Sequence, residues 1–147
     1  MNKKLFALLS ILVIASFALA ACGAKATAAP ETKLAVGIVL PTKDEPRWVQ
    51  DETRFKDALT AAGYDVEILF SQGDSAKEKA NVESLITKGV KVIILTPQDG
   101  AAAGAAAEAA RAAGVKVISY DRLIRDTDAV DFYVTFDSIS VGAAQAQ

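Results

Sequence analysis

Histidine is absent from this chain of 147 residues, and cysteine occurs once, as Cys22. Without an imidazole, neither Ser-His-Asp nor Cys-His catalysis is possible, and no zinc site can include a histidine ligand. One cysteine also rules out a zinc site built from cysteines alone and any disulfide within the chain. We therefore expect no metal site, and we expect a binding role in place of an enzymatic one.

The glycine fingerprints of nucleotide-binding proteins are missing as well. Such a fingerprint follows the first strand of an α/β nucleotide-binding fold, but here Leu40 is followed by the sequence PTKD. Gly100 and Gly104 have the wrong spacing for it, so no nucleotide cofactor is expected. The formal charge of −2 argues against a nucleic-acid partner, because such binding depends on an excess of lysine and arginine.

The first 21 residues have the composition of a secretory signal. Lys3 and Lys4 precede an apolar run, Leu5–Ala21, which is slightly short for a spanning helix of about 20 apolar residues. The run ends in Leu-Ala-Ala-Cys22 and resembles a bacterial lipobox, where the cysteine is lipidated and begins the mature protein. We expect a lipoprotein signal peptide at residues 1–21 and a lipid on Cys22. A non-lipidated signal and an uncleaved anchor are the alternatives.

Residues 22–33 are expected to form the lipidated cysteine and a tether. The sequence GAKATAAPETK, residues 23–33, is small and polar, which is typical of a flexible linker with a reach of about 20 Å. The folded part, residues 34–147, would then lie outside the cytoplasm and close to a membrane. Removal of Lys3 and Lys4 with the signal changes the formal charge from −2 to −4, so the mature chain stays mildly acidic.

A repeated pattern organises the rest of the chain. Gly63, Gly89 and Gly114 each follow a helix-like stretch and precede a run rich in β-branched residues, at nearly equal intervals. Glycine in this position ends a helix in the left-handed conformation. Alternation of helices with strands indicates βαβ units and a parallel sheet. The pattern predicts an α/β fold with a Rossmann-like parallel sheet.

The expected elements follow from this pattern. Strands are expected near Leu34–Leu40, Val66–Phe70, Val92–Leu95, Val115–Ser119 and Phe132–Phe136. Helices are expected near Arg47–Ala62, Ser75–Lys88, Ala101–Ala113 and from Ser138 onward. Asp74 and Asp99 are placed to cap the second and third helices. The alanine-rich third helix is expected to pack close to the sheet.

Polar side chains follow the strands at one edge of this sheet. Ligands of open α/β sheets bind beyond the carboxyl ends of the strands, where Asp121 and Arg122 follow the fourth strand and Arg47 and Trp48 follow the first. Carboxylate and guanidinium groups make charge-assisted, often bidentate hydrogen bonds to adjacent hydroxyls. An aromatic ring can cover the apolar face of a pyranose. The combination indicates a sugar site.

Each of these residues also has a plainer interpretation. The spacing of Trp48 on its helix favours a core position, and Asp121 with Arg122 could form a structural ion pair. Asp137 could cap the following helix, which we favour over a ligand role, and Lys43 could be a solvated lysine. Asp121 and Asp137 could also act as the paired carboxylates of a glycoside hydrolase. The cation beside Asp121 suits an acceptor better than an acid.

The chain resembles the sugar-binding proteins of the periplasmic-binding-protein type I class, in the xylose-binding and multiple-sugar-binding branch. The matching stretches are GIVLPTK (37–43), PRW (46–48), ITKGVKV (86–92), VISYDRLI (117–124) and YVTFD (133–137). They run in order along residues 34–147. The resemblance implies an extracytoplasmic receptor that delivers an aldose, such as xylose, glucose, galactose or arabinose, to an ABC permease in the membrane.

The resemblance also implies which residues contact the sugar. The candidate ligand residues are Arg47, Trp48, Asp121, Arg122, Lys43 and Asp137. Counterparts of Arg47, Asp121 and Arg122 hydrogen-bond the sugar in the family, and the counterpart of Trp48 stacks on it. The family has asparagine after the counterpart of Asp137, where this chain has Ser138, so no polar role is carried over to that position.

Members of the family have two lobes that enclose the sugar, and the match here covers one, the N-terminal lobe. We therefore expect a truncated, incomplete receptor that binds weakly by itself. A sugar-sensing module for chemotaxis or for a two-component kinase is the alternative. The ligand-sensing core of a repressor shares the architecture, but the signal segment argues against it. An enzyme is the least favoured reading.

Overall fold

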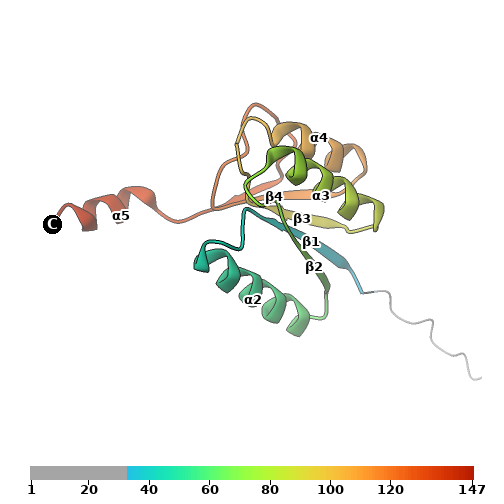
Figure 1. Ribbon diagram of the computed structural model, residues 1–147, viewed down its shortest axis with the longest axis horizontal. Coiled ribbons are helices and arrows are strands. Elements are labelled where there is room, and N and C mark those ends of the chain that lie inside the picture. The colour runs from blue at the N-terminus through green and yellow to red at the C-terminus, as the bar shows by residue number, and fades with distance from the viewer. Residues whose placement is uncertain (1–32) are drawn as a thin grey trace, which may run out of the picture. The chain divides into compact units, whose positions relative to one another are not determined.

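Five parallel strands form one sheet in the computed structural model, which describes residues 33–147 (Figure 1). The strands are β1 (Ala35–Leu40), β2 (Asp65–Phe70), β3 (Val92–Leu95), β4 (Lys116–Tyr120) and β5 (Phe132–Val134). Their order in the sheet is β2-β1-β3-β4-β5, and every neighbouring pair is parallel. The predicted α/β class is confirmed. The expected signal peptide at residues 1–21 and the expected lipidation site and tether at residues 22–32 lie outside the described residues.

The helices alternate with the strands. They are α2 (Pro46–Ala61), α3 (Ser75–Thr87), α4 (Gly104–Ala112) and α5 (Ser138–Gln145). Helix α2 lies on one face of the sheet, and α3 and α4 lie on the other (Figure 1). Helix α5 has no buried residue. None of the helices in the described part of the chain is long and apolar enough to cross a membrane.

The winding of the sheet reverses between β1 and β3. From β1 the chain passes through α2 to β2 on one side, and it then returns through α3 to β3 on the other side of β1. The connections after β1 and β3 therefore leave toward opposite faces of the sheet. A reversal of this kind opens a crevice beyond the carboxyl ends of the strands, and it fixes where a ligand site is expected.

Two hydrophobic clusters fill the two faces because successive side chains of a strand point to opposite sides. Ile38 and Leu40 of β1 pack toward α2, whereas Val39 packs on the side of α3 and α4. Gly37 marks a close approach of α3 to β1, since a Cβ atom there would lie 2.7 Å from Cδ1 of Leu85. The clusters hold the strand ends in a fixed arrangement.

The repeated glycines end helices in the left-handed conformation, as the sequence pattern predicts. Gly63, Gly89 and Gly114 have φ values of 89°, 81° and 74°, and each follows the end of a helix. The alanine-rich helix α4 is closely packed, as expected, but it begins at Gly104 and not at Ala101. The Asp99 carboxylate accepts hydrogen bonds from two backbone N–H groups of a turn that precedes this helix. Asp99 therefore caps that turn and does not cap α4 itself.

Candidate functional site

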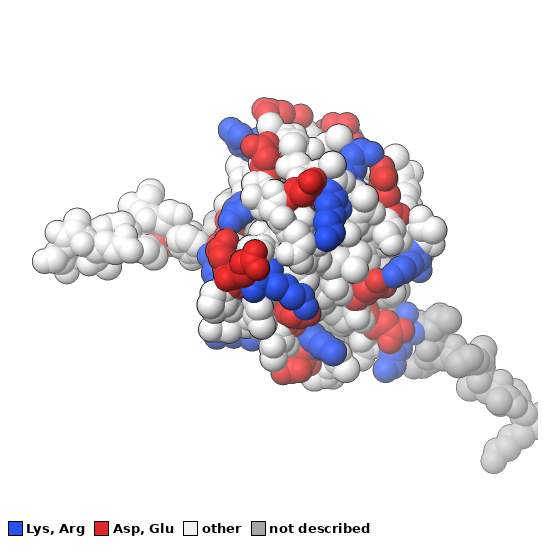
Figure 2. All heavy atoms as spheres, in the orientation of Figure 1, with Lys and Arg blue, Asp and Glu red and all other residues white. Residues whose placement is uncertain are grey.

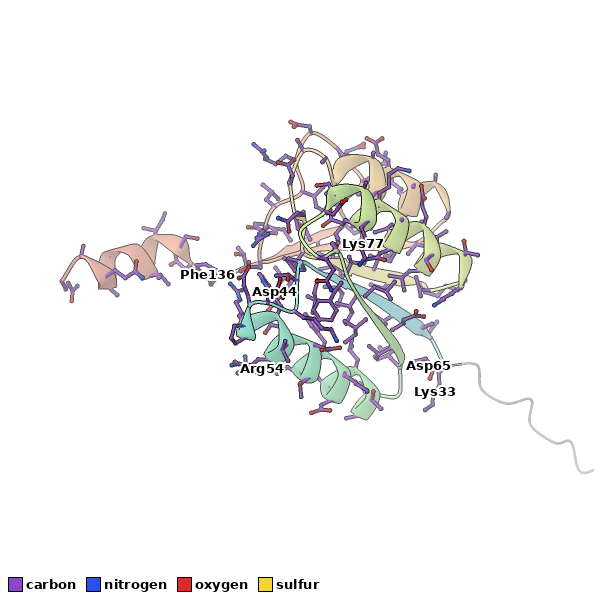
Figure 3. All side chains as sticks on the ribbon, in the orientation of Figure 1. Lys33, Asp44, Arg54, Asp65, Lys77 and Phe136 are labelled. Atoms are coloured by element: carbon purple, nitrogen blue, oxygen red, sulfur yellow. The ribbon has the colours of Figure 1, made fainter. Side chains whose placement is uncertain are left out.

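The carboxyl ends of the strands gather at one edge of the sheet. Figure 3 places Asp44, which follows β1, and Phe136, which follows β5, at the same end of the molecule. Lys33, before β1, and Asp65, at the start of β2, lie at the opposite end. We call the first of these ends the carboxyl edge. On the face shown in Figure 2, basic and acidic side chains are interspersed and do not gather by sign.

An ion pair between Arg47 and Asp121 joins two distant segments at the carboxyl edge. Arg47 Nη2 lies 2.5 Å from Asp121 Oδ1, across 74 residues of sequence. Pro46 is the first residue of α2 and suits that position because its φ is already helical. The arginine that follows is thereby held near the end of β1. Its hydrogen bond to Asp121 raises the pKa of Arg47 above the ordinary value.

The backbone of Asp121 adopts an uncommon conformation. Its φ is 63°, in the left-handed region that aspartate tolerates better than most residues. The Asp121 N–H donates to the carbonyl of Val134 at 2.8 Å, and its own carbonyl accepts from the hydroxyls of Tyr133 and Thr135 at 3.1 Å. Strained residues of this kind cluster at binding sites, and here β5 holds the strained residue in place.

Arg122 points to the neighbouring strand end. Its Nη1 donates to the carbonyl of Pro97, after β3, at 3.3 Å. Its carbonyl accepts from the hydroxyl of Ser119 at 2.6 Å, and that same hydroxyl accepts from the N–H of Ile124. These bonds fix the loop after β4. They place the Arg122 guanidinium near the end of β3, while Arg47 reaches Asp121 from the start of α2, after β1.

Trp48 lies beneath both arginines. The Arg47 guanidinium carbon is 4.5 Å from the centroid of the Trp48 ring, and that of Arg122 is 5.4 Å away. Trp48 is only 1% exposed and belongs to the hydrophobic cluster between the sheet and α2. The core interpretation of this residue is confirmed, and its stacking on a sugar stays a prediction. The structure therefore brings Arg47, Trp48, Asp121 and Arg122 together, as the sequence pattern predicts.

The two other candidate residues are engaged elsewhere. Lys43 pairs with Glu52 at 3.4 Å and lies 4.6 Å above the ring of Phe70. Asp137 accepts from the N–H groups of Ile139 and Ser140 and so caps α5. The Ser140 hydroxyl lowers the pKa of Asp137 below its ordinary value. Their roles as ligand residues stay predictions.

Sequence reasoning missed a support beneath the ion pair. Asp51, one turn after Arg47 on α2, is buried and lies 3.9 Å from its Nε. The Tyr120 hydroxyl donates to Asp51 at 3.2 Å, and the Tyr120 ring meets Phe55 edge to face at 5.0 Å. Burial raises the pKa of Tyr120, with the Asp51 charge as the next cause. The position of Asp51 one helical turn after Arg47 is the only signal in the sequence.

A second missed residue is Glu78, in the first turn of α3. It is 1% exposed, and its Oε2 accepts from the N–H of Gln98 at 2.7 Å. Burial raises the pKa of Glu78 to about 7. The signal was present in the sequence, because Glu78 shares one helix face with the buried Val82 and Leu85.

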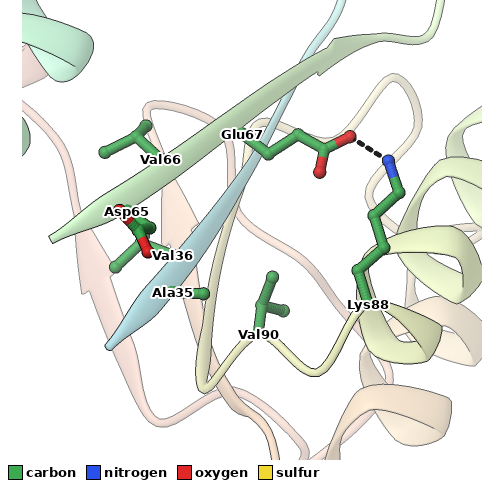
Figure 4. A pocket seen from close by; sticks show the side chains of 7 residues that line it. All are labelled: Ala35, Val36, Asp65, Val66, Glu67, Lys88 and Val90. Atoms are coloured by element: carbon green, nitrogen blue, oxygen red, sulfur yellow. Dashed lines mark hydrogen bonds and ion pairs between the residues drawn. The ribbon is translucent and has the colours of Figure 1, made fainter. Parts of the chain in front are cut away.

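A separate pocket of about 180 Å³ lies at the opposite edge of the sheet (Figure 4). Its lining includes Val36, Val66 and Val90. Asp65, Glu67 and Lys88 also line it, and the last two form an ion pair. No group of three or more carboxylate or cysteine side chains in residues 33–147 is arranged to hold a metal ion.

Comparison with known proteins identifies the fold. Residues 36–147 match the family described as periplasmic binding protein domain. The chain belongs to the periplasmic binding protein family. Its sheet and helices match one lobe of the type I class. The residues of the carboxyl edge are therefore part of a periplasmic binding protein lobe.

Curated relatives of this periplasmic binding protein are named for sugars. The chain is 39% identical to the multiple sugar-binding periplasmic receptor ChvE of Rhizobium radiobacter, over 91% of this chain and 39% of the relative. It is 30% identical to the D-xylose-binding periplasmic protein of Escherichia coli, over 82% of this chain and 36% of the relative. The chain thus spans little more than a third of the length of these relatives.

Solved structures agree in fold. A carbohydrate transporter solute-binding protein from Chloroflexus aurantiacus, in complex with D-glucose, is 81% identical with a TM-score of 0.74, over 78% of this chain and 34% of that one. The Caulobacter myo-inositol binding protein, bound to myo-inositol, is 28% identical with a TM-score of 0.72, over 77% and 38%. These relatives are named as binding proteins and not as enzymes.

Proposed function

We propose that this chain forms one lobe of an extracytoplasmic receptor that binds a monosaccharide and delivers it to an ABC importer. The observation that carries the proposal is the convergence of Arg47, Asp121 and Arg122 at the reversal of the sheet. The names of the relatives and the D-glucose in the Chloroflexus structure support it. The alternatives that need a catalytic group, a metal or a nucleotide have no comparable support.

The chemistry of the three side chains suits a ring of adjacent hydroxyls. The Asp121 carboxylate accepts one hydrogen bond from Arg47 and has further lone pairs for sugar hydroxyls. Arg122 donates to Pro97 through one nitrogen, and its other N–H groups are donors of fixed geometry. Acceptor and donor on consecutive residues can therefore engage neighbouring hydroxyls of one sugar.

Tight binding needs more than this lobe. The chain covers about a third of the relatives' length, so we propose that a second lobe supplies the other contacts. Sugar held between two lobes shifts an open–closed equilibrium toward the closed form by its greater affinity for that form. In this proposal the closed form is what the permease recognises. A lipid on Cys22 would keep the receptor at the membrane that contains the permease.

Calorimetry on the full-length product of the gene that carries this sequence tests the proposal. D-xylose, D-glucose, D-galactose and L-arabinose are titrated into the wild type and into Asp121→Ala and Arg122→Ala. We expect binding of at least one sugar, and each variant should lose about 1–3 kcal/mol or more of binding free energy because a buried hydroxyl is left unpaired. Arg111→Ala on α4, whose ion pair with Asp128 involves none of these residues, should bind as the wild type does. No heat from any of the four sugars would count against the function.

A sugar sensor is the second candidate. One relative, ChvE, is named as a receptor, and the same lobe could report sugar occupancy to a chemoreceptor or a kinase. Crosslinking of the sugar-loaded full-length protein in membranes separates the two functions. Recovery of a permease supports transport, whereas recovery of a kinase or chemoreceptor supports sensing.

A further inference from the structure

Glu78 is a buried carboxylate that the proposed site does not yet use. It extends from the first turn of α3 toward the loop between β3 and α4, where its Oε2 accepts from the Gln98 N–H at 2.7 Å. The preceding residue of that loop, Pro97, holds Arg122 through its carbonyl. One short segment of backbone therefore connects Glu78 to a side chain of the candidate sugar site.

Two charged groups on other elements act on Glu78 within the described part of the chain. The positive charge of Arg122 favours the ionised carboxylate, and the negative charge of Asp99 opposes it. On its own helix, Asp74 is the N-cap and is occupied by the N–H groups of Ala76 and Lys77. Arg122 thus attracts Glu78 directly as well as through the loop.

We propose that Glu78 is a positioning residue for Arg122, and that its ionised form strengthens sugar binding by holding the β3–α4 loop and the guanidinium in place. The inference rests on the proposed function. An ionised carboxylate makes a stronger, charge-assisted bond to the Gln98 N–H than a neutral one and attracts Arg122. On protonation the attraction to Arg122 is lost, and the loop that carries Pro97 is held less firmly.

The change falls in an accessible pH range. Burial raises the pKa of Glu78 to about 7, so the side chain passes from neutral to ionised between mildly acidic and mildly alkaline solution. Histidine, the residue that ordinarily titrates there, is absent from the chain. If sugar binds the ionised form better, binding must also release protons, because the coupling is reciprocal.

The test compares three forms of the full-length protein: wild type, Glu78→Gln and Glu83→Gln. The first variant keeps an oxygen acceptor for the Gln98 N–H and removes the charge. The second makes the same change at an exposed position of the same helix, where Glu83 pairs with Lys79, and serves as the matched control. D-glucose and D-xylose are titrated by calorimetry from pH 5.5 to 8.5, in buffers of different ionisation enthalpy.

For wild type and Glu83→Gln we expect affinity to rise about tenfold across this range, which corresponds to a fall of about one unit in the pKa of Glu78 on binding. Sugar binding by these two forms should release protons to the solution. Glu78→Gln should bind more weakly at pH 8.5, with a flat profile and no proton release attributable to this residue. Urea unfolding of each form at both pH values shows whether all are folded.

Two results would overturn the inference, and they are distinguishable. If the wild type binds sugar with an affinity that does not change with pH, or if Glu78→Gln keeps the wild-type profile, Glu78 does not position Arg122, and the sugar-binding function still stands. If D-glucose, D-xylose, D-galactose and L-arabinose give no heat with folded wild type at any pH, the proposed function fails and the inference fails with it.

Discussion

Substitutions at Asp121 separate its role in folding from its role in binding. Its carboxylate is 9% exposed and pairs with Arg47, whose side chain is 49% exposed. Because the arginine can return to water when its partner is removed, Asp121→Asn should cost about 1 kcal/mol of folding free energy, well below the cost of breaking a fully buried pair. Asparagine also tolerates the left-handed backbone of this position.

Alanine and glycine at the same position add a test of the backbone. At a φ of 63°, alanine should cost about a further 1 kcal/mol because its Cβ is disfavoured there, so Asp121→Ala should lose about 2 kcal/mol in all. Asp121→Gly loses the carboxylate without that strain and should be more stable than Asp121→Ala. Sugar affinity of the full-length protein should fall by about 1–3 kcal/mol in both, since both lack the acceptor.

Urea unfolding of residues 33–147, followed by circular dichroism, measures the first quantity, and calorimetry with D-glucose on the full-length protein measures the second. If Asp121→Ala is as stable as Asp121→Gly, the strain assigned to the left-handed conformation is wrong. If Asp121→Gly binds sugar more tightly than Asp121→Ala, in the order of their stabilities, the loss of the carboxylate does not explain the weaker binding. The assignment of Asp121 as a sugar ligand would then be wrong.

Three further outcomes are expected. Gly37→Ala should lower the free energy of unfolding by about 1–3 kcal/mol, since the new methyl group meets Leu85 at 2.7 Å; an unchanged urea midpoint would contradict the close packing of β1 on α3. The pKa of Glu78 is about 7 in the folded chain and has its ordinary value of 4.5 in the unfolded chain. The free energy of unfolding should therefore fall as the pH rises from 4.5 to about 7. Glu78→Gln should therefore stabilise the chain at pH 8 by about 3 kcal/mol, with no gain at pH 4; an equal effect at both pH values would argue against the raised pKa. The wild type should incorporate a labelled fatty acid and Cys22→Ser should not, and equal labelling of the two would contradict lipidation on Cys22.

Local chemistry made most of the fold predictable. The helix-ending glycines are recognisable because few other residues adopt their backbone conformation. Asp74 and Asp137 were correctly placed as caps, because a carboxylate directly before a helix can bond to the free N–H groups of the first turn. Trp48 was correctly placed in the core by its spacing on α2. Each of these features depends on residues within a few positions of one another.

The partners within the site could not be predicted in the same way. The sequence suggested that Asp121 pairs with Arg122, its neighbour, but the carboxylate bonds to Arg47. That contact depends on how the end of β1 meets the end of β4, with β3 between them, which no local pattern specifies. Glu78 was missed because a charged residue in a first helical turn is usually solvated, and only the packing of α3 against the next loop buries it.

In the function proposed here, sugar binds at the carboxyl edge through Asp121 and Arg122. A crystal structure of the full-length protein grown with D-glucose tests it most directly. We expect sugar hydroxyls within hydrogen-bond distance of the Asp121 carboxylate and the Arg122 guanidinium, with the sugar beyond the ends of β1 and β4. A sugar bound elsewhere, with both side chains contacting only protein, would contradict it.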